Sequence, residues 1–135
     1  MIVIETSALV AIAFNEPECA EFIAAVVGAD TALVSAVSIA ESRMVVHRRK
    51  GAEAVQALDE LVAQTVFEIV PPGEAEIAAA HAAFIAYGKG SGHPAQLNFG
   101  DLFGYALAKT RGLPLLFKGD DFSQTDIESA TKQLG

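Results

Sequence analysis

The chain has 135 residues, 9 of them basic and 17 acidic, and its formal net charge is −8. Such an acidic chain does not adhere unspecifically to nucleic acid or anionic membranes, so RNA binding would need a local basic patch or bound metal ions. A hydrophobic content of 52% allows a sizeable core and argues against disorder. A single cysteine, Cys19, excludes an intrachain disulfide and a thiolate zinc site.

The ends of the chain and its longest apolar runs bear on where the protein acts. The N-terminus lacks a basic region followed by an apolar signal segment, and no apolar run reaches the ~18 residues that a membrane span needs. We therefore expect a soluble, cytoplasmic protein with no membrane contact, folded as one domain over residues 1–135.

The first strand and the first helix are joined by an acid. The β-branched run of residues 2–4 predicts a buried strand, and the apolar stretch 8–14 predicts a helix capped by Thr6 or Ser7. Glu5 lies between them. In open α/β folds, ligands bind beyond the carboxyl ends of the strands, so Glu5 indicates a functional site. The alternative is that Glu5 only complements the helix dipole.

Further along the chain, predicted helices alternate with predicted strands. Proline, glycine and capping residues delimit helices at residues 17–27, 37–50, 52–64, 74–87 and 99–111. Strands are predicted at residues 32–35, 66–70 and 114–117, with a short last helix after a loop at 118–122 and no element beyond residue 127. This alternation predicts a parallel sheet with helices on both faces and right-handed crossovers, an α/β fold of three layers (α/β/α).

Acidic residues follow the predicted strands or lie in the helices behind them. Glu5 follows the first strand, Glu41 lies about one turn into the helix after the second strand, and Asp101 opens the helix at 99–111. Asp120 and Asp121 follow the fourth strand. Each has an ordinary explanation, respectively the helix dipole, a capping box from Ser38, the dipole again, and turn chemistry. A parallel sheet would nevertheless bring them all to one edge.

A cluster of carboxylates needs a cation. Two carboxylates ~5 Å apart repel by roughly 3 kcal/mol at an effective dielectric constant of 20. Mg²⁺ or Mn²⁺ would relieve this repulsion, because hard cations prefer oxygen ligands. A metal held in this way activates water and offsets charge on a phosphoryl oxygen, so the cluster predicts hydrolysis of a phosphodiester.

Four stretches, together with the loop at 87–90, carry a resemblance over nearly the whole chain. They read IVIETSALV at residues 2–10, SAVSIAE at 35–41, NFGD at 98–101 and LLFKGDDF at 115–122. The chain resembles PIN-domain ribonucleases, specifically VapC-type toxins of type II toxin–antitoxin pairs. The resemblance implies a PIN-like domain, endonucleolytic RNA cleavage with Mg²⁺ (or Mn²⁺ in its place), a homodimer, and inhibition by a small VapB-like antitoxin.

The resemblance also implies the site residues. The catalytic and metal-binding acids are Glu5, Glu41, Asp101 and one of Asp120 and Asp121, with Asp121 taken as the metal ligand of that pair. Thr6, Ser7 and Asn98 fall on supporting positions that orient those acids. We expect the antitoxin to cover this acidic edge with a basic side chain.

Glu5 departs from the family, which has Asp at this position. The extra methylene displaces the carboxylate by about one C–C bond, and a misplacement of ~1 Å can cost on the order of 10²-fold in rate. Two hypotheses therefore stay open for Glu5: a tolerated ligand in an active enzyme, or the mark of an attenuated PIN domain that acts mainly as an antitoxin-binding partner.

Other features are less specific. Residues 43–50 hold the densest basic patch, formed by Arg43, His47, Arg48, Arg49 and Lys50, which suits either an RNA backbone or a solvated helix end. Lys109, Arg111 and Lys118 are similarly ambiguous. The Gly-rich loop at 88–92 lacks the order of a phosphate-binding loop. A signalling receiver domain would need a phospho-accepting Asp after its central strand, taken here as the strand at 66–70, which ends in PPG.

Overall fold

The computed structural model describes residues 1–131 as a four-stranded parallel sheet between two layers of helices. The strands lie in the order β3–β2–β1–β4, so that β1 is an inner strand. Their bounds are β1 (Ile2–Ile4), β2 (Ala32–Ser35), β3 (Phe67–Val70) and β4 (Leu115–Leu116). This architecture confirms the predicted three-layer α/β/α fold.

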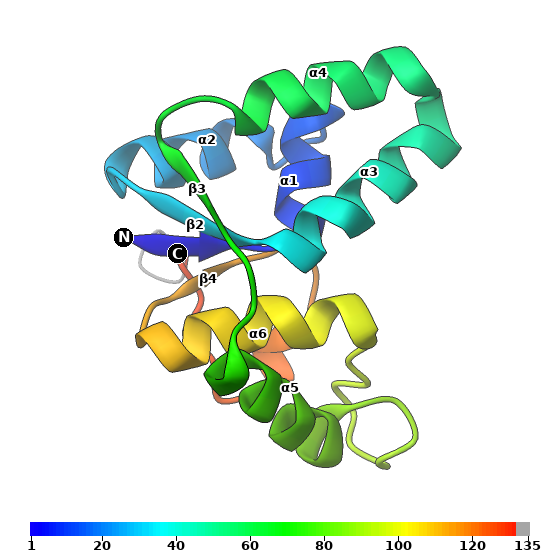
Figure 1. The fold of residues 1–135 in the computed structure, drawn as a ribbon, viewed down its shortest axis with the longest axis vertical. Coiled ribbons are helices and arrows are strands. Elements are labelled where there is room, and N and C mark those ends of the chain that lie inside the picture. The colour runs from blue at the N-terminus through cyan, green and yellow to red at the C-terminus, as the bar shows by residue number, and fades with distance from the viewer. Residues whose placement is uncertain (132–135) are drawn as a thin grey trace.

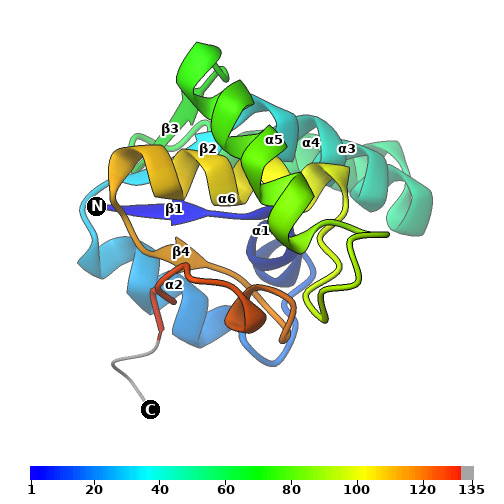
Figure 2. The same ribbon diagram turned by 90° about the horizontal axis from the view of Figure 1, so that it is seen from below.

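The helices divide between the two faces of the sheet. One face is covered by α1 (Thr6–Ala13), α2 (Cys19–Gly28), α3 (Ala36–Lys50) and α4 (Ala52–Val62), and the other by α5 (Glu74–Tyr87) and α6 (Phe99–Arg111) (Figure 1). Figure 2, seen from below, shows α6 running beside β1 in front of the sheet, with α5 in front of α6. A short 3-10 helix, η1 (Phe122–Gln124), follows β4.

Alternate strand residues enter two different cores, since successive side chains of a strand point to opposite faces. Val3, Leu33 and Leu115 pack into the core shared with α5 and α6. Ile4 and Val34 pack into the core shared with α1 and α2. Both faces of the inner strands are thus covered, which explains why their sequences are continuously apolar rather than alternating.

Two predicted helix caps are wrong. Glu5, and neither Thr6 nor Ser7, is the N-cap of α1, and its carboxylate accepts a hydrogen bond from the backbone N–H of Ser7. The N-cap of α3 is Ser35, which accepts from the N–H of Val37, so the predicted capping box from Ser38 to Glu41 does not form. Both helices begin directly at a strand end, one to two residues earlier than we predicted.

Most element bounds agree with the prediction within two residues, and α5 and α6 agree fully. Two placements differ. The strand β3, taken as central when a receiver domain was considered, is an edge strand. The segment after Ile127, for which no element was predicted, returns to the sheet, where Ser129 forms a parallel bridge with Leu115.

Within residues 1–131, no helix has the length and apolar character needed to cross a membrane.

Candidate active site

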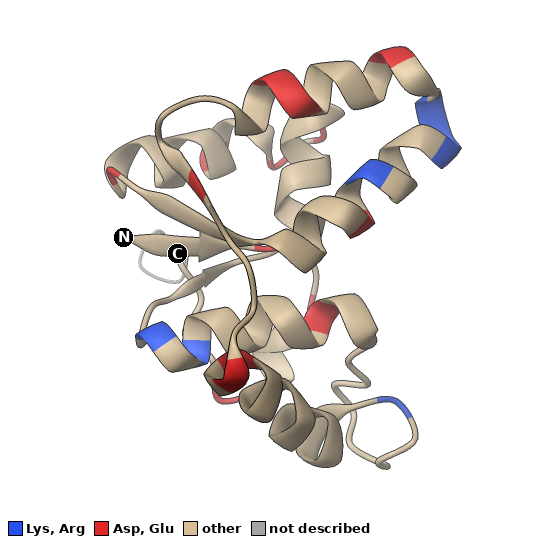
Figure 3. Cartoon of the chain, viewed as in Figure 1, with Lys and Arg blue, Asp and Glu red and all other residues tan. Residues whose placement is uncertain are grey.

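A cavity of about 300 Å³ lies at the carboxyl ends of the strands, where α1, α3 and α6 begin, and we call it the acidic cavity. Figure 3 shows acidic positions on α3 and α6 on this side of the molecule, and basic positions gathered toward the far end of α3. The acidic cavity is lined by Glu5, Thr6, Ser7, Val10, Glu16, Glu41, Val45, Arg49, Asn98, Asp101 and Lys118.

Glu5 is the most deeply buried acid of this cavity, with only 1% of its surface exposed. Its Oε2 accepts hydrogen bonds from the backbone N–H of Ser7 (2.8 Å) and from the Ser7 hydroxyl (2.6 Å). Burial raises the pKa of Glu5 from 4.5 to about 8, and the charges of Asp101 and Glu41 add to the rise, against the two bonds from Ser7. Glu5 therefore retains a proton at neutral pH unless a cation displaces it.

Asp101 lies in the first turn of α6, where Asn98 orients it. The Asp101 carboxylate accepts from the Asn98 N–H and the Asn98 side chain accepts from the Asp101 N–H, both at 2.9 Å, which is a capping box. Burial raises the pKa of Asp101, and the charges of Glu41 and Asp121 raise it further. The predicted role of Asn98 as the partner of this acid thus has a geometric basis.

Glu41 approaches the same cavity from α3. Its Oε1 is buried and has no hydrogen-bond partner among the described residues. The carboxylate lies against Gly100 of α6, where a Cβ would overlap it. One turn later a Cβ on Gly104 would lie only 2.9 Å from Cγ of Glu5. Two glycines of one helix face therefore make room for two carboxylates, including the longer one at position 5.

The potential metal-ligating atoms of the acidic cavity fit a hard cation such as Mg²⁺ or Mn²⁺. They are carboxylate oxygens, and a buried one without a partner is costly unless a cation or a proton reaches it. Within residues 1–131 the side chains as they stand form no group of three or more His, Cys, Asp or Glu in ligand geometry. Cation binding would thus require Glu5 to ionise and the carboxylates to turn toward a common point.

Of the remaining predicted site residues, some contact the acids of the cavity and others do not. The Ser7 hydroxyl donates to Glu5, whereas the Thr6 hydroxyl donates to the backbone carbonyl of Ser38 at 3.4 Å. Asp120 and Asp121 are exposed and do not line the cavity. Of these two acids, Asp121 has a charge that acts on Asp101.

Sequence reasoning missed Glu16 and the two glycines of α6. Glu16 follows α1 and pairs with Lys118, whose Nζ lies 2.9 Å from Oε1 of Glu16. This hydrogen bond raises the pKa of Lys118. Nothing in the local sequence marks Glu16. Gly100 and Gly104 did carry a signal, because glycine inside a helix costs about 1 kcal/mol relative to alanine and such a position often marks a close approach.

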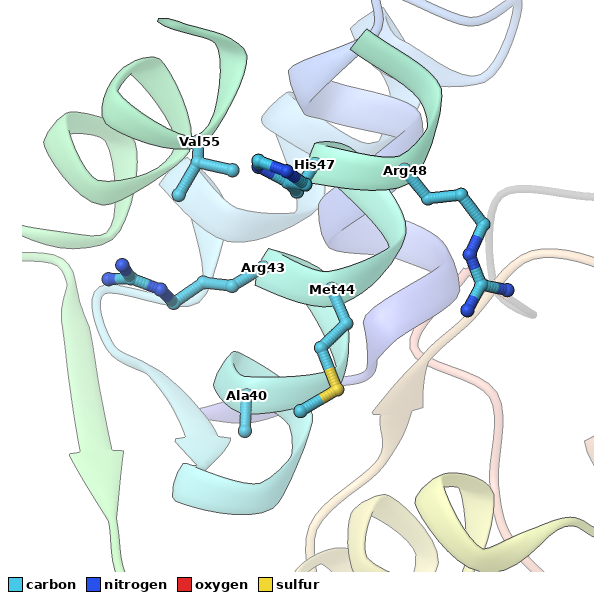
Figure 4. Close-up of a pocket in the computed structure, with 6 residues that line it drawn as sticks. All are labelled: Ala40, Arg43, Met44, His47, Arg48 and Val55. Carbon is cyan, nitrogen blue, oxygen red and sulfur yellow. The ribbon is translucent and has the colours of Figure 1, made fainter. Parts of the chain in front are cut away.

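A larger pocket of about 650 Å³ lies elsewhere, between α3 and α4 (Figure 4). It is lined by Ala40, Arg43, Met44, His47, Arg48 and Val55, none of them acidic. Arg43 is held by Asp59 of α4, with both carboxylate oxygens 2.9 Å from its Nη1. This pocket lacks the groups that hydrolysis needs.

Comparison with known proteins identifies the family. The family model described as PIN domain matches residues 2–128. The chain belongs to the PIN-domain family. Ribonuclease VapC28 of Mycobacterium tuberculosis is 41% identical over 128 residues, which are 95% of this chain and 96% of that protein. Ribonuclease VapC30 of the same species is 44% identical over 125 residues, or 93% and 95% of the two chains.

Solved structures of this family share the fold. Mycobacterium tuberculosis VapC20, described as a Sarcin-Ricin loop cleaving toxin, superposes with a TM-score of 0.75 at 17% identity, covering 94% of this chain and 96% of that one. FitAcB from Neisseria gonorrhoeae gives a TM-score of 0.66 at 23% identity, with 96% of each chain covered. The PIN-domain relatives at about 40% identity are VapC ribonucleases, and this membership excludes the receiver-domain alternative.

Proposed function

We propose that this PIN-domain protein is a metal-dependent endoribonuclease of the VapC type, the toxin of a toxin–antitoxin pair. One observation carries the proposal: Glu5, Glu41 and Asp101 come from three separate elements into one cavity, and one oxygen of Glu41 there has no partner. The VapC ribonucleases of similar sequence support the substrate class. The extent of a single PIN-like domain over residues 1–135 stays a prediction.

In this proposal the acids hold the metal, and neighbouring polar side chains orient the acids. Glu5, Glu41 and Asp101 would hold Mg²⁺, with Asp121 as the fourth acid. When bound, the metal supplies an activated water and offsets charge on the phosphoryl oxygen. Ser7 fixes Oε2 of Glu5 and the Asn98 N–H fixes Oδ2 of Asp101, so only small rotations of these carboxyl groups remain to bring them to a common point. The proton that Glu5 retains must leave before it can act as a ligand.

The test is cleavage of a mixed RNA pool by the purified protein with Mg²⁺, Mn²⁺ or EDTA. We expect cleavage with either metal and none in EDTA. Asp101→Asn should lower the rate by on the order of 10² or more, since one charged group of the site is lost, with a melting temperature in EDTA that matches the parent. Glu60→Gln, which removes an exposed acid of α4, is the matched control and should cleave like the parent. Full activity of a folded Asp101→Asn protein would show that the site assignment is wrong.

Glu5→Asp separates the two hypotheses for position 5. If both the parent and Glu5→Asp cleave, Glu5 is a tolerated ligand. If only Glu5→Asp cleaves, the parent is an attenuated enzyme. If neither cleaves although metal binds, the antitoxin-binding partner becomes the better hypothesis, because the fold is retained without turnover.

Partners and location complete the proposal. We expect a cytoplasmic homodimer, which light scattering would detect as about twice the mass of the 14.1 kDa chain.

A VapB-like antitoxin should insert a basic side chain into the acidic cavity, so Glu41→Gln combined with Asp101→Asn should weaken the complex in calorimetry. Unchanged affinity of the double variant would place the antitoxin contact elsewhere.

A further inference from the structure

Two basic side chains line the acidic cavity together with its carboxylates. Lys118 and Arg49 both line it, although they come from the loop after β4 and from the last turn of α3. Their side chains are 36% and 57% exposed, so their charged groups can reach solvent and ligand. The cavity therefore combines a buried acid, Glu5, and two half-buried acids, Glu41 and Asp101, with two partly exposed basic side chains.

Lys118 is fixed to the site by its backbone. Its N–H donates to the Ser7 hydroxyl at 2.9 Å, and the same hydroxyl donates to Oε2 of Glu5 at 2.6 Å. One serine thus ties the start of the Lys118 side chain to the acid at the end of β1. Arg49 is steadied from another direction, with its guanidinium 5.7 Å from the centre of the Phe14 ring.

Glu16 bridges the two cations. Its Oε1 lies 2.9 Å from Nζ of Lys118, and its Oε2 lies 3.9 Å from Nη1 of Arg49. Glu18 adds a second contact to Lys118 at 3.4 Å. A carboxylate with one oxygen toward each cation has the arrangement that two oxygens of a phosphate group would adopt between the same cations.

We propose that Lys118 and Arg49 form the phosphate-binding rim of the acidic cavity, and that Glu16 occupies the place between them that a phosphate of single-stranded RNA takes on binding. This inference rests on the proposed ribonuclease function. It explains how a chain with a net charge of −8 can bind RNA next to several carboxylates. The other basic group considered, at the α3–α4 pocket, has Arg43 neutralised by Asp59.

Substitution of the two cations and substitution of Glu16 should change KM in opposite directions. Lys118→Met and Arg49→Met each remove one phosphate contact and should raise KM several-fold while changing kcat less. Glu16→Gln removes the carboxylate charge between the two cations and leaves Lys118 paired with Glu18 alone, so KM should fall. Lys109→Met is the matched control, because Lys109 forms a similar ion pair with Asp126 (2.6 Å) away from the cavity and should match the parent.

Salt dependence gives a readout that does not require turnover. Binding of a fluorescein-labelled single-stranded oligoribonucleotide is measured by anisotropy at several salt concentrations, with Asp101→Asn in every protein to prevent cleavage. Each lost phosphate contact should reduce the slope of log K against log salt by about 0.7. Lys118→Arg, which keeps the charge, should restore the slope.

The outcomes separate this inference from the proposed function. Equal salt slopes for Lys118→Met and Lys109→Met would contradict a phosphate contact at Lys118. Weaker RNA binding by Glu16→Gln would also contradict the proposed phosphate-binding role, because a purely structural network loses affinity whichever member is removed. A parent protein that cleaves RNA while showing either result keeps the proposed function. A parent that neither cleaves nor binds RNA overturns both.

Discussion

Glu5 combines two roles in one side chain. Its Oε2 caps α1 through Ser7, and the same carboxyl group lines the acidic cavity. The sequence predicted Glu5 as a site residue from its place after a strand. Its retained proton was not predictable, because that depends on burial beneath α6 and on Asp101, nearly a hundred residues away in the chain.

The raised pKa of Glu5 predicts how stability depends on pH without divalent metal. The folded protein holds the proton of Glu5 up to about pH 8, whereas the unfolded chain loses it near 4.5. The stabilisation is therefore complete below pH 4.5 and is lost as pH rises to about 8, by up to about 1.4 kcal/mol per pH unit. Urea unfolding in EDTA across this range should show the decline.

Glu5→Gln is the control, since glutamine fills the same space without titrating. Its free energy of unfolding should fall less between pH 5 and about pH 8, and should exceed that of the parent at the upper end. Parallel curves for the two proteins would show that Glu5 does not hold its proton in this range.

Asp121 is the better candidate than Asp120 for the fourth acid of the site. The charge of Asp121 raises the pKa of the Asp101 carboxyl group. Asp121→Asn should therefore lower metal-dependent cleavage by roughly 10-fold or more, as expected for a lost charge near the reacting group, whereas Asp120→Asn should not. Cleavage rates of the two variants at saturating Mg²⁺ test this. The reverse order would make Asp120 the fourth acid.

Among the elements, α6 contributes both an acid and the space for two other acids. It presents Asp101 in its first turn and places two glycines against the carboxylates of Glu41 and Glu5. The bounds of α6 were predictable because Asn98 and Gly112 mark them locally. Its packing against α3 was not, because contacts between helices far apart in sequence leave no local pattern.

The same distinction explains the two wrong caps. Ser and Thr are common N-caps, so local preference favoured Thr6, Ser7 and Ser38. In the structure the strands run directly into their helices, and the caps fall on Glu5 and Ser35 at the strand ends. The sheet, rather than local preference, decides where these helices begin.

Gly100→Ala tests the close approach of α6 to Glu41. The new Cβ would overlap the Glu41 carboxylate, so we expect cleavage to fall by on the order of 10²-fold through displacement of this acid. Gly28→Ala is the control, because a Cβ there meets nothing within 4 Å. RNA cleavage rates and melting temperatures of both variants test whether the loss of activity comes from this contact. An active Gly100→Ala protein would mean that Glu41 can move without consequence.

At the scale of the whole molecule, the sheet gathers acids from distant parts of the chain. β1 lies between β2 and β4, and the elements that follow these strands begin at one edge. Alternation of helices and strands predicted this edge correctly. It did not predict the strand order, which placed β3 at the side of the sheet rather than its centre.

Metal should stabilise the whole fold through this edge. A cation that binds only the folded protein raises the free energy of unfolding by about 2.7 kcal/mol at a concentration 100 times its Kd. Thermal unfolding should therefore shift upward in Mg²⁺ or Mn²⁺ for the parent, and much less for Asp101→Asn. An equal shift in both proteins would point to metal binding outside the acidic cavity.

The hydrogen bond from the Lys118 backbone to the Ser7 hydroxyl spans 111 positions of the chain. During translation, Ser7 is made early and must wait for Lys118 before the strand pair β1–β4 and the cavity wall can close. A ribosome that stalls before β4 therefore carries a nascent chain without a complete site.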